Sequence, residues 1–69
     1  MPKMTKIKKA RIIAGYTQTE FAEKVGVSTG SVSQWESGAT HPKVKRLKKL
    51  SDILNIPVEE LIDDDEKVG

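Results

Sequence analysis

The chain has 69 residues, a length that allows one small domain. It contains no cysteine and a single histidine, His41, so disulfide bonds are excluded and a structural zinc site is not expected. The basic N-terminal part has only short apolar runs, too short for a signal peptide or a membrane span. We therefore expect a cytoplasmic protein without a metal or other cofactor.

Charge is distributed unevenly along the chain. Residues 1–49 carry 11 Lys and Arg against 3 acids, a net charge of +8, whereas residues 50–69 carry 1 Lys against 7 acids, a net charge of −6. This asymmetry predicts one face for a polyanion and an opposite end that avoids it. The alternative is an ordinary solvated surface with a solubilising tail, and charge alone does not separate the two.

The first predicted helix covers residues 4–14 and ends at Gly15. Its apolar residues with helical spacing are Met4, Ile7, Ala10, Ile13 and Ala14. We expect Ile7, Ile13 and Ala14 to cover the core formed by the next two helices. A basic amphipathic helix lying on a membrane surface is the alternative, and it is disfavoured because that apolar face is needed inside.

The second predicted helix begins after Thr17, which with Glu20 has the spacing of a capping box. Tyr16 and Phe21 have the spacing of a hydrophobic staple, which sets the direction in which the chain enters the helix. Gly26 ends the helix, because glycine adopts the left-handed conformation without a steric clash. The residues predicted on its buried face are Phe21, Ala22 and Val25.

The third predicted helix repeats these signals immediately afterwards. Ser28 is a cap residue, Val27 and Val32 have staple spacing, and Gly38 ends the helix. Val32 and Trp35 form its predicted buried side. Two capped helices joined by a short turn with glycine are typical of a helix-turn-helix.

The remaining chain predicts a loop over residues 39–42, a helix from about Lys43 to Asn55, and a last short helix after Pro57. The inner stripe of the longer helix is predicted to hold Val44, Leu47, Leu50, Ser51 and Leu54. No segment alternates as a strand would. We therefore predict an all-α five-helix domain over residues 1–62, followed by an acidic disordered tail over residues 63–69.

Three cations crowd the start of the helix that follows the loop. Lys43, Lys45 and Arg46 lie in the first turn, where the helix dipole disfavours each cation by ~0.3–1 kcal/mol at low salt. No acid lies between Ser37 and Ser51 to offset them. A bound phosphate would satisfy both the cations and the free helix N–H groups. The lysines at 48 and 49 are interpreted as solvated.

These residues resemble the Cro/cI-type (XRE-family) helix-turn-helix proteins. The resemblance lies in Gln18-x-x-Phe21-Ala22-x-x-x-Gly26-Val27-Ser28, in Val32-Ser33-Gln34-Trp35-Glu36-x-Gly38, and in Pro42 with the Leu47/Leu50/Leu54 helix. It covers roughly residues 5–62. It implies a five-helix domain, compact and of the lambda-repressor-like type, that binds operator DNA, usually as a dimer, with its third helix in the major groove. It also implies that Arg11 and Glu36 form a pair bracing the first helix against the third.

The outward side of the third helix is the predicted reading surface. Gln34 suits bidentate hydrogen bonding to adenine, while the short Thr29 and Gly30 leave room for water-mediated or shape readout. Gly30 either permits close backbone approach to DNA or is merely tolerated in a first turn. By resemblance Gln18 anchors a phosphate, and its alternative is an ordinary exposed residue. The predicted DNA-binding residues are Thr17, Gln18, Ser28, Thr29, Gly30, Ser31, Gln34, Thr40, Lys43, Lys45 and Arg46.

The predicted function is a sequence-specific DNA-binding transcriptional regulator, most simply a repressor, of phage, mobile-element or antitoxin origin. Its expected partner is double-stranded operator DNA, bound by a homodimer, with no membrane and no small-molecule ligand. No catalytic residue is predicted, because the sequence places no Ser-Asp pair and no metal ligand at motif spacing from His41. Val58, Leu61 and Ile62 either pack at a two-fold interface or close the core. The alternative function is a protein-interaction module or antitoxin-type partner-binding protein of the same fold, supported by the short Thr29–Gly30 surface and opposed by the Lys43–Arg46 cations.

Overall fold

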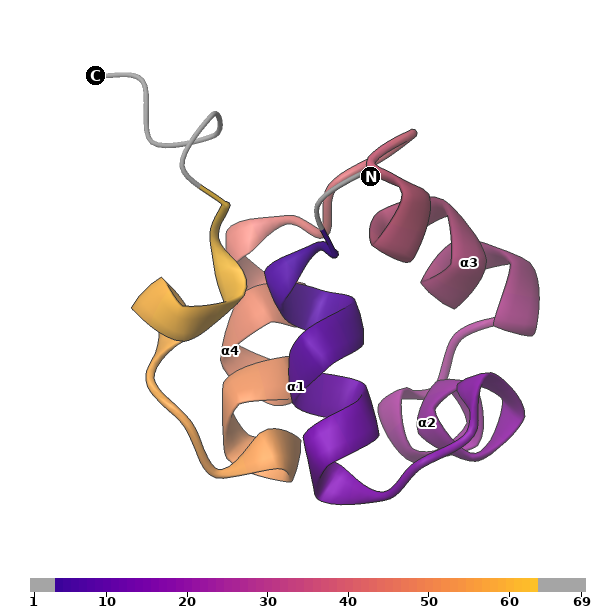
Figure 1. Ribbon diagram of the computed structural model, residues 1–69, viewed down its shortest axis with the longest axis horizontal. Helices are drawn as coiled ribbons and strands as arrows, with labels where there is room; N and C mark the ends of the chain where they lie inside the picture. The colour runs from indigo at the N-terminus through magenta and orange to yellow at the C-terminus, as the bar shows by residue number, and fades with distance from the viewer. Residues whose placement is uncertain (1–3, 64–69) are drawn as a thin grey trace.

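The computed structural model describes residues 4–63 and contains no strand in that part of the chain. Its elements are α1 (Lys6–Ala14), α2 (Gln18–Val25), α3 (Thr29–Ser37), α4 (Val44–Leu54) and the 3-10 turn η1 (Val58–Leu61). α1 and α4 lie side by side, with η1 beyond them on one side and α2 and α3 on the other (Figure 1). The all-α prediction is confirmed. The prediction of a fifth helix is wrong, because the segment after Pro57 forms only the 3-10 turn η1.

The two helices of the predicted motif begin and end as their sequences indicate. The Thr17 hydroxyl accepts a hydrogen bond from Glu20 N, and the Glu20 carboxylate accepts one from Thr17 N at 2.9 Å, which completes the capping box. Ser28 caps α3 in the same way by accepting from Ser31 N. Gly26 and Gly38 end the helices with φ of +87° and +83°. The local signals are therefore sufficient to set both helices.

The face of α1 that packs inside differs from the predicted one. Ile7 and Arg11 are buried, whereas Ile13 is 75% exposed and Ala14 is also exposed. α1 is also shorter than predicted, because Thr5 is its N-cap and accepts from Lys8 N. The i, i+4 pair of Ile7 and Arg11 sets the inner face, so the apolar residues at the end of the helix turn outward.

The part of the chain after residue 43 differs from the prediction at the start of α4 and in the last element. Val44 was predicted on the inner stripe of α4, but it is 70% exposed because it lies in the first turn. η1 has only four residues and is held by an i+3 bond from Glu60 N to Pro57 O. Asn55 ends α4 in the left-handed conformation, as expected.

The core joins residues from every element. Phe21 is fully buried, and its ring centroid lies 6.0 Å from that of Tyr16, as the predicted staple requires. Leu61 of η1 is buried beside the leucines of α4, so this residue closes the core. The buried apolar residues are Ile7, Phe21, Ala22, Val25, Val32, Trp35, Leu47, Leu50, Leu54 and Leu61.

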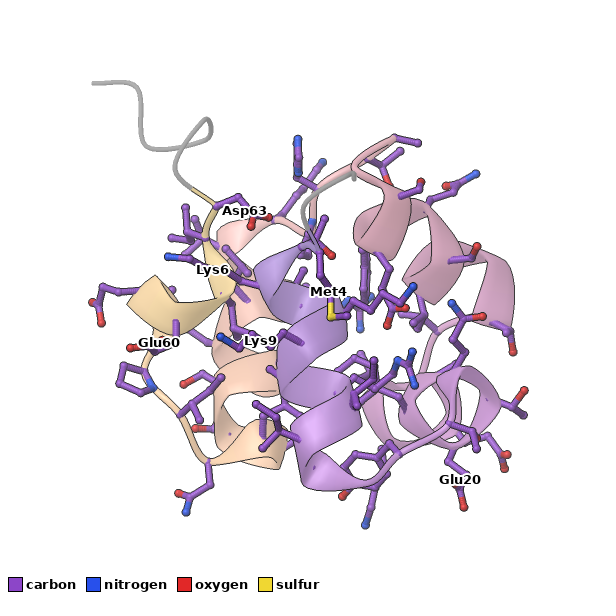
Figure 2. The ribbon with its side chains drawn as sticks, in the orientation of Figure 1. Met4, Lys6, Lys9, Glu20, Glu60 and Asp63 are labelled. Atoms are coloured by element: carbon purple, nitrogen blue, oxygen red, sulfur yellow. The ribbon has the colours of Figure 1, made fainter. Side chains whose placement is uncertain are left out.

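The last described residue, Asp63, ties the end of η1 to the start of α1. Its Oδ1 accepts a hydrogen bond of 3.0 Å from Lys6 N, and the two residues lie beside each other in Figure 2. A carboxylate at a helix start satisfies a free N–H group and favours the dipole. The rest of the predicted acidic tail, residues 64–69, lies outside the described residues.

Candidate nucleic-acid interface

α3 presents one buried and one exposed side. Val32 is fully buried and Trp35 is 8% exposed, while Thr29, Gly30 and Gln34 on the other side are exposed. This is the arrangement that the sequence predicts for a recognition helix, whose N-terminal residues face outward. The side-chain amide of Gln34 makes no hydrogen bond within residues 4–63, so its donor and acceptor groups face solvent.

The two serines at the start of α3, Ser28 and Ser31, form hydrogen bonds with each other. Ser28 Oγ accepts from Ser31 N at 3.1 Å and also lies 3.1 Å from Ser31 Oγ. One hydroxyl of this pair therefore donates to the other, and Ser28 is committed to capping. A serine hydroxyl that contacts another molecule would therefore do so while it remains hydrogen-bonded to the other serine.

Gln18 has a partner that the sequence did not indicate. Its Nε2 donates to Glu36 Oε1 at 3.0 Å, which links the start of α2 to α3. An amide has two N–H donors and one carbonyl oxygen, so this bond orients the group and leaves a second N–H. No periodicity marks a pair 18 residues apart, so only the structure reveals this contact.

Glu36 is held in turn by Arg11, as the resemblance implied. Arg11 Nε lies 2.5 Å from Glu36 Oε2, and Arg11 Nη2 donates to Glu36 Oε1 at 3.2 Å. Arg11 Nη1 also donates to Tyr16 O at 2.7 Å. Both charged groups are buried, and every buried side-chain N or O atom in the described residues has a partner. This network therefore sets α1, α2 and α3 relative to one another.

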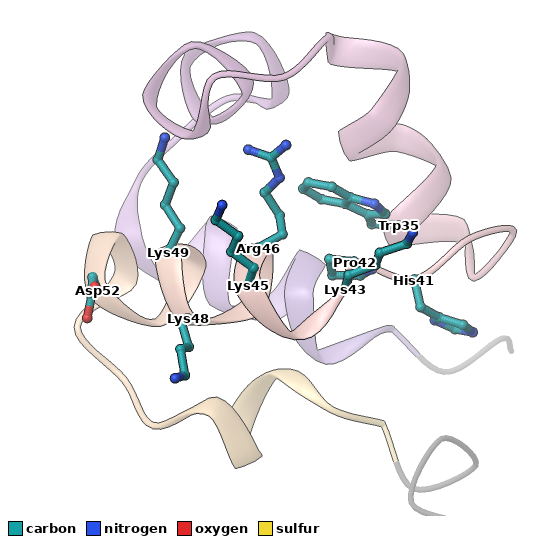
Figure 3. A pocket seen from close by; sticks show the side chains of 9 residues that line it. All are labelled: Trp35, His41, Pro42, Lys43, Lys45, Arg46, Lys48, Lys49 and Asp52. Atoms are coloured by element: carbon teal, nitrogen blue, oxygen red, sulfur yellow. The ribbon is translucent and has the colours of Figure 1, made fainter.

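The start of α4 differs from the starts of α2 and α3. Lys43 occupies the N-cap position without a side-chain cap hydrogen bond, and no acid lies in the first turn. Lys43 and Lys45 are exposed, while Arg46 is half-buried. Together with Trp35 they line an open groove along α4 (Figure 3). The groove is thus basic, with Asp52 the acid among its lining residues.

Figure 3 shows that Lys48 and Lys49, both interpreted from the sequence as solvated, project in different directions. Lys45, Arg46 and Lys49 project from α4 toward α2, whereas Lys48 projects the other way, toward η1. A Cβ placed on Gly26 would lie 3.6 Å from Lys49 Nζ, so this ammonium group lies near the C-terminal end of α2. Cations are favoured there. The i+4 spacing from Lys45 is a sequence signal that would have placed Lys49 on the same face.

The predicted binding residues lie at the starts of α2 and α4, along α3 as far as Gln34, and in the loop before α4. The loop is anchored by Gln34 O, which accepts from the N–H groups of Ala39 and Thr40 at 3.0 and 3.4 Å. Gln18, Ser31 and Arg46 are half-buried. The exposed members of the predicted set are Thr17, Ser28, Thr29, Gly30, Gln34, Thr40, Lys43 and Lys45.

Two further observations on the described part of the chain concern metal ions and membranes. Residues 4–63 contain no group of three His, Cys, Asp or Glu side chains that would hold a metal ion. Among the same residues, no helix has the length and apolar character needed to cross a bilayer. What the site offers is a polar helix face flanked by cations, which is suited to a large anionic surface.

Comparison with known proteins identifies the family of the chain. The sequence profile described as helix-turn-helix matches residues 7–61. The chain is 38% identical over 61 residues to the HTH-type transcriptional regulator ImmR of Bacillus subtilis (strain 168), covering 88% of this chain and 48% of ImmR. It is 38% identical over 45 residues to the cryptic phage CTXphi transcriptional repressor RstR of Vibrio cholerae serotype O1 (strain ATCC 39315 / El Tor Inaba N16961), covering 65% of this chain and 40% of RstR. The chain therefore spans about half the length of these relatives or less.

A solved structure resembles the fold closely. The crystal structure of SinR, named as the master regulator for biofilm formation, in complex with DNA matches with a TM-score of 0.74. The two chains are 36% identical, and the match covers 83% of this chain and 95% of that one.

Proposed function

Because this chain belongs to the XRE family of helix-turn-helix proteins, we propose that it is a sequence-specific DNA-binding transcriptional regulator. It inserts α3 into the major groove of an operator half-site. The observation that supports this most is the exposed polar side of α3, presented by a fold that matches a DNA-bound regulator. The activity is binding rather than catalysis, and it takes place in the cytoplasm.

Base reading rests on the exposed residues of α3. Gln34 pairs with an adenine, and this is supported by its exposed amide group, which has no partner within the described residues. Thr29 offers a hydroxyl and a methyl group to neighbouring bases. Ser28 and Ser31, which already bond to each other, contribute through shared hydrogen bonds or through water.

Phosphate binding rests on the starts of α2 and α4. The second N–H of the Gln18 amide, oriented by Glu36, donates to a phosphate beside Thr17. Lys43, Lys45 and Arg46, which line the groove along α4, bind the DNA phosphates on the other side of α3. Such contacts position the protein on the duplex, whereas α3 selects the sequence.

The operator is proposed to be a palindrome bound by two copies of the chain. Two-fold symmetric binding of this kind places half-sites about one helical turn apart, ~34 Å. Leu61 belongs to the core, so of the three candidate interface residues only Val58 and Ile62 remain half-buried. A dimer that covers a promoter excludes polymerase, and repression is therefore the expected outcome.

Selection from random duplexes tests this proposal. The purified chain is incubated with random DNA fragments over a range of salt concentrations, and the retained pool is sequenced. We expect the logarithm of the affinity to fall linearly with the logarithm of the salt concentration. We also expect a palindrome to be enriched in the retained pool. Retention without an enriched sequence would contradict specific regulation. No retention at low salt would contradict DNA binding and favour a protein-interaction module or an antitoxin-type partner-binding protein.

The direction of regulation needs a separate measurement. The selected palindrome is placed across a promoter that drives a reporter, and the chain is supplied from an inducible copy. We expect reporter output to fall in proportion to operator occupancy. A rise in output with the same occupancy would replace repression by activation and leave DNA binding intact.

A further inference from the structure

The glycines of the described region fall into two kinds. Gly15, Gly26 and Gly38 have φ of +86°, +87° and +83° and end helices. Side chains other than glycine are strained in this conformation. Gly30 differs, because it is the second residue of α3 and its φ is not positive.

The fold has space for a side chain at Gly30. A Cβ placed there would meet one neighbour within 4 Å, Ser28 Oγ at 3.7 Å, which is an ordinary van der Waals distance. The position is exposed. Since glycine favours a helix less than any other residue except proline, alanine would suit this position better. Packing and backbone conformation therefore do not account for the glycine.

Gly30 leaves the backbone of the first turn of α3 uncovered at one exposed position. Ser28 and Ser31 on either side are turned toward each other, with 3.1 Å between their hydroxyl oxygens. The backbone N–H groups of Thr29 and Gly30 make no hydrogen bond within residues 4–63, as expected for the first positions of a helix. The first turn of α3 thus presents the bare backbone of Gly30, beside the exposed side chain of Thr29, to an approaching molecule.

We propose that Gly30 determines how closely α3 approaches the base edges, because its missing Cβ lets the first turn lie against the floor of the major groove. This inference rests on the proposed function. Position 30 is then a determinant of operator affinity and specificity, although it has no side chain to form a contact. A methyl group there pushes α3 outward and weakens the base contacts of Thr29 and Gln34 together.

Three versions of the full chain test this: the unmodified chain, Gly30→Ala, and Asn55→Gly as a control matched in stability. Asn55 holds φ of +56° at the far end of α4, where glycine is the preferred residue. Thermal unfolding is followed by circular dichroism. Binding is measured at one salt concentration to the selected palindrome and to a scrambled duplex of the same composition.

We expect both substitutions to raise Tm, with Gly30→Ala adding about 4 °C. Gly30→Ala should weaken binding to the palindrome by about ten-fold, the effect of one lost base contact. Its binding to the scrambled duplex should be unchanged, because phosphate contacts dominate there. Asn55→Gly should bind both duplexes as the unmodified chain does.

Several results would overturn the proposal. Undiminished affinity of Gly30→Ala for the palindrome would show that glycine is only tolerated in the first turn. A lower Tm for Gly30→Ala would show that the fold itself requires glycine. An equal loss on both duplexes would place the effect on the DNA backbone. If the unmodified chain binds neither duplex, the proposed function fails as well, and that outcome is distinct from the other three.

Discussion

The starts of α2 and α3 contrast with the start of α4. Thr17 and Ser28 each accept a hydrogen bond from a free N–H group of the helix that follows. At the start of α4, Lys43 offers no such acceptor, and Lys45 and Arg46 add positive charge to the same turn. Two helix starts thus have a side-chain cap inside the protein, while the third has none and carries unfavourable charge.

The contrast separates helix starts that are capped within the protein from the start that we propose to bind phosphate. The capped starts, together with the Arg11–Glu36 pair, hold α2 and α3 in one arrangement before anything binds. We propose that the uncapped start of α4 gains hydrogen bonds and charge balance when it binds a phosphate of the DNA. Four substitutions test this division, beginning with the largest expected effect.

Glu36→Ala should destabilise the motif most severely. It leaves the buried Arg11 guanidinium without its carboxylate and removes the partner of Gln18. Breaking a buried ion pair costs about 3–5 kcal/mol, a large share of the roughly 3–10 kcal/mol expected for a domain of this size. Urea unfolding followed by circular dichroism measures the loss. Glu23→Ala, at an exposed acid of α2, is the control, and a loss below about 1 kcal/mol in Glu36→Ala would contradict the proposed brace.

Gln34→Ala should leave the fold intact and relax base selection. The side chain is exposed and makes no hydrogen bond within the described residues, so stability should change by less than about 0.5 kcal/mol. Discrimination at one operator position should fall by about 1–3 kcal/mol. Competition binding with single-base variants of the palindrome measures this. Equal weakening at every position would assign Gln34 to general docking rather than base reading.

Thr17→Ala makes the start of α2 resemble that of α4. The substitution removes the acceptor for Glu20 N and should cost about 1 kcal/mol of stability. Thr17→Ser is the matched control, since it keeps the hydroxyl and should restore most of the loss. Thermal unfolding of both variants measures the difference. If Thr17→Ala were as stable as Thr17→Ser, the capping box would have little energetic weight.

Lys43→Ser makes the converse change, because it adds a side-chain cap to the start of α4. It supplies a capping hydroxyl and removes a cation from the first turn, so stability should rise by about 0.5–1 kcal/mol. Loss of one phosphate contact should lower the slope of log affinity against log salt by about 0.9, equally for all sequences. Lys48→Ser is the control, because Lys48 projects toward η1. Equal salt slopes for the two variants would contradict the phosphate role of Lys43.

Features that depend on neighbouring residues were predictable from sequence. A capping hydroxyl, as at Thr17 and Ser28, accepts a hydrogen bond from an N–H group within four residues of it. A helix end requires glycine at one position, as at Gly26. The outward face of α3 also followed, because Val32 and Trp35 fix which side is buried.

The inner face of α1 was not predictable from its own pattern. Apolar spacing placed Ile13 inside, but the face that packs includes Arg11, whose burial depends on Glu36, 25 residues away. A buried arginine is costly without that partner, so no local rule would select it. The resemblance to a known family implied the pair, yet the rotation of α1 around it emerged only from packing.

The sequence by itself determined the four helices, the caps that position the motif, and the basic start of α4, because each rests on contacts within a turn or two. Tertiary structure decided which side of α1 is buried and that the chain after Pro57 forms only a 3-10 turn. It also decided that Gln18 bonds to Glu36 and that Gly30 has space for a side chain. The buried side of α1 and the bond from Gln18 to Glu36 depend on distances between separate helices, and such distances are set by packing of the whole core rather than by any one segment.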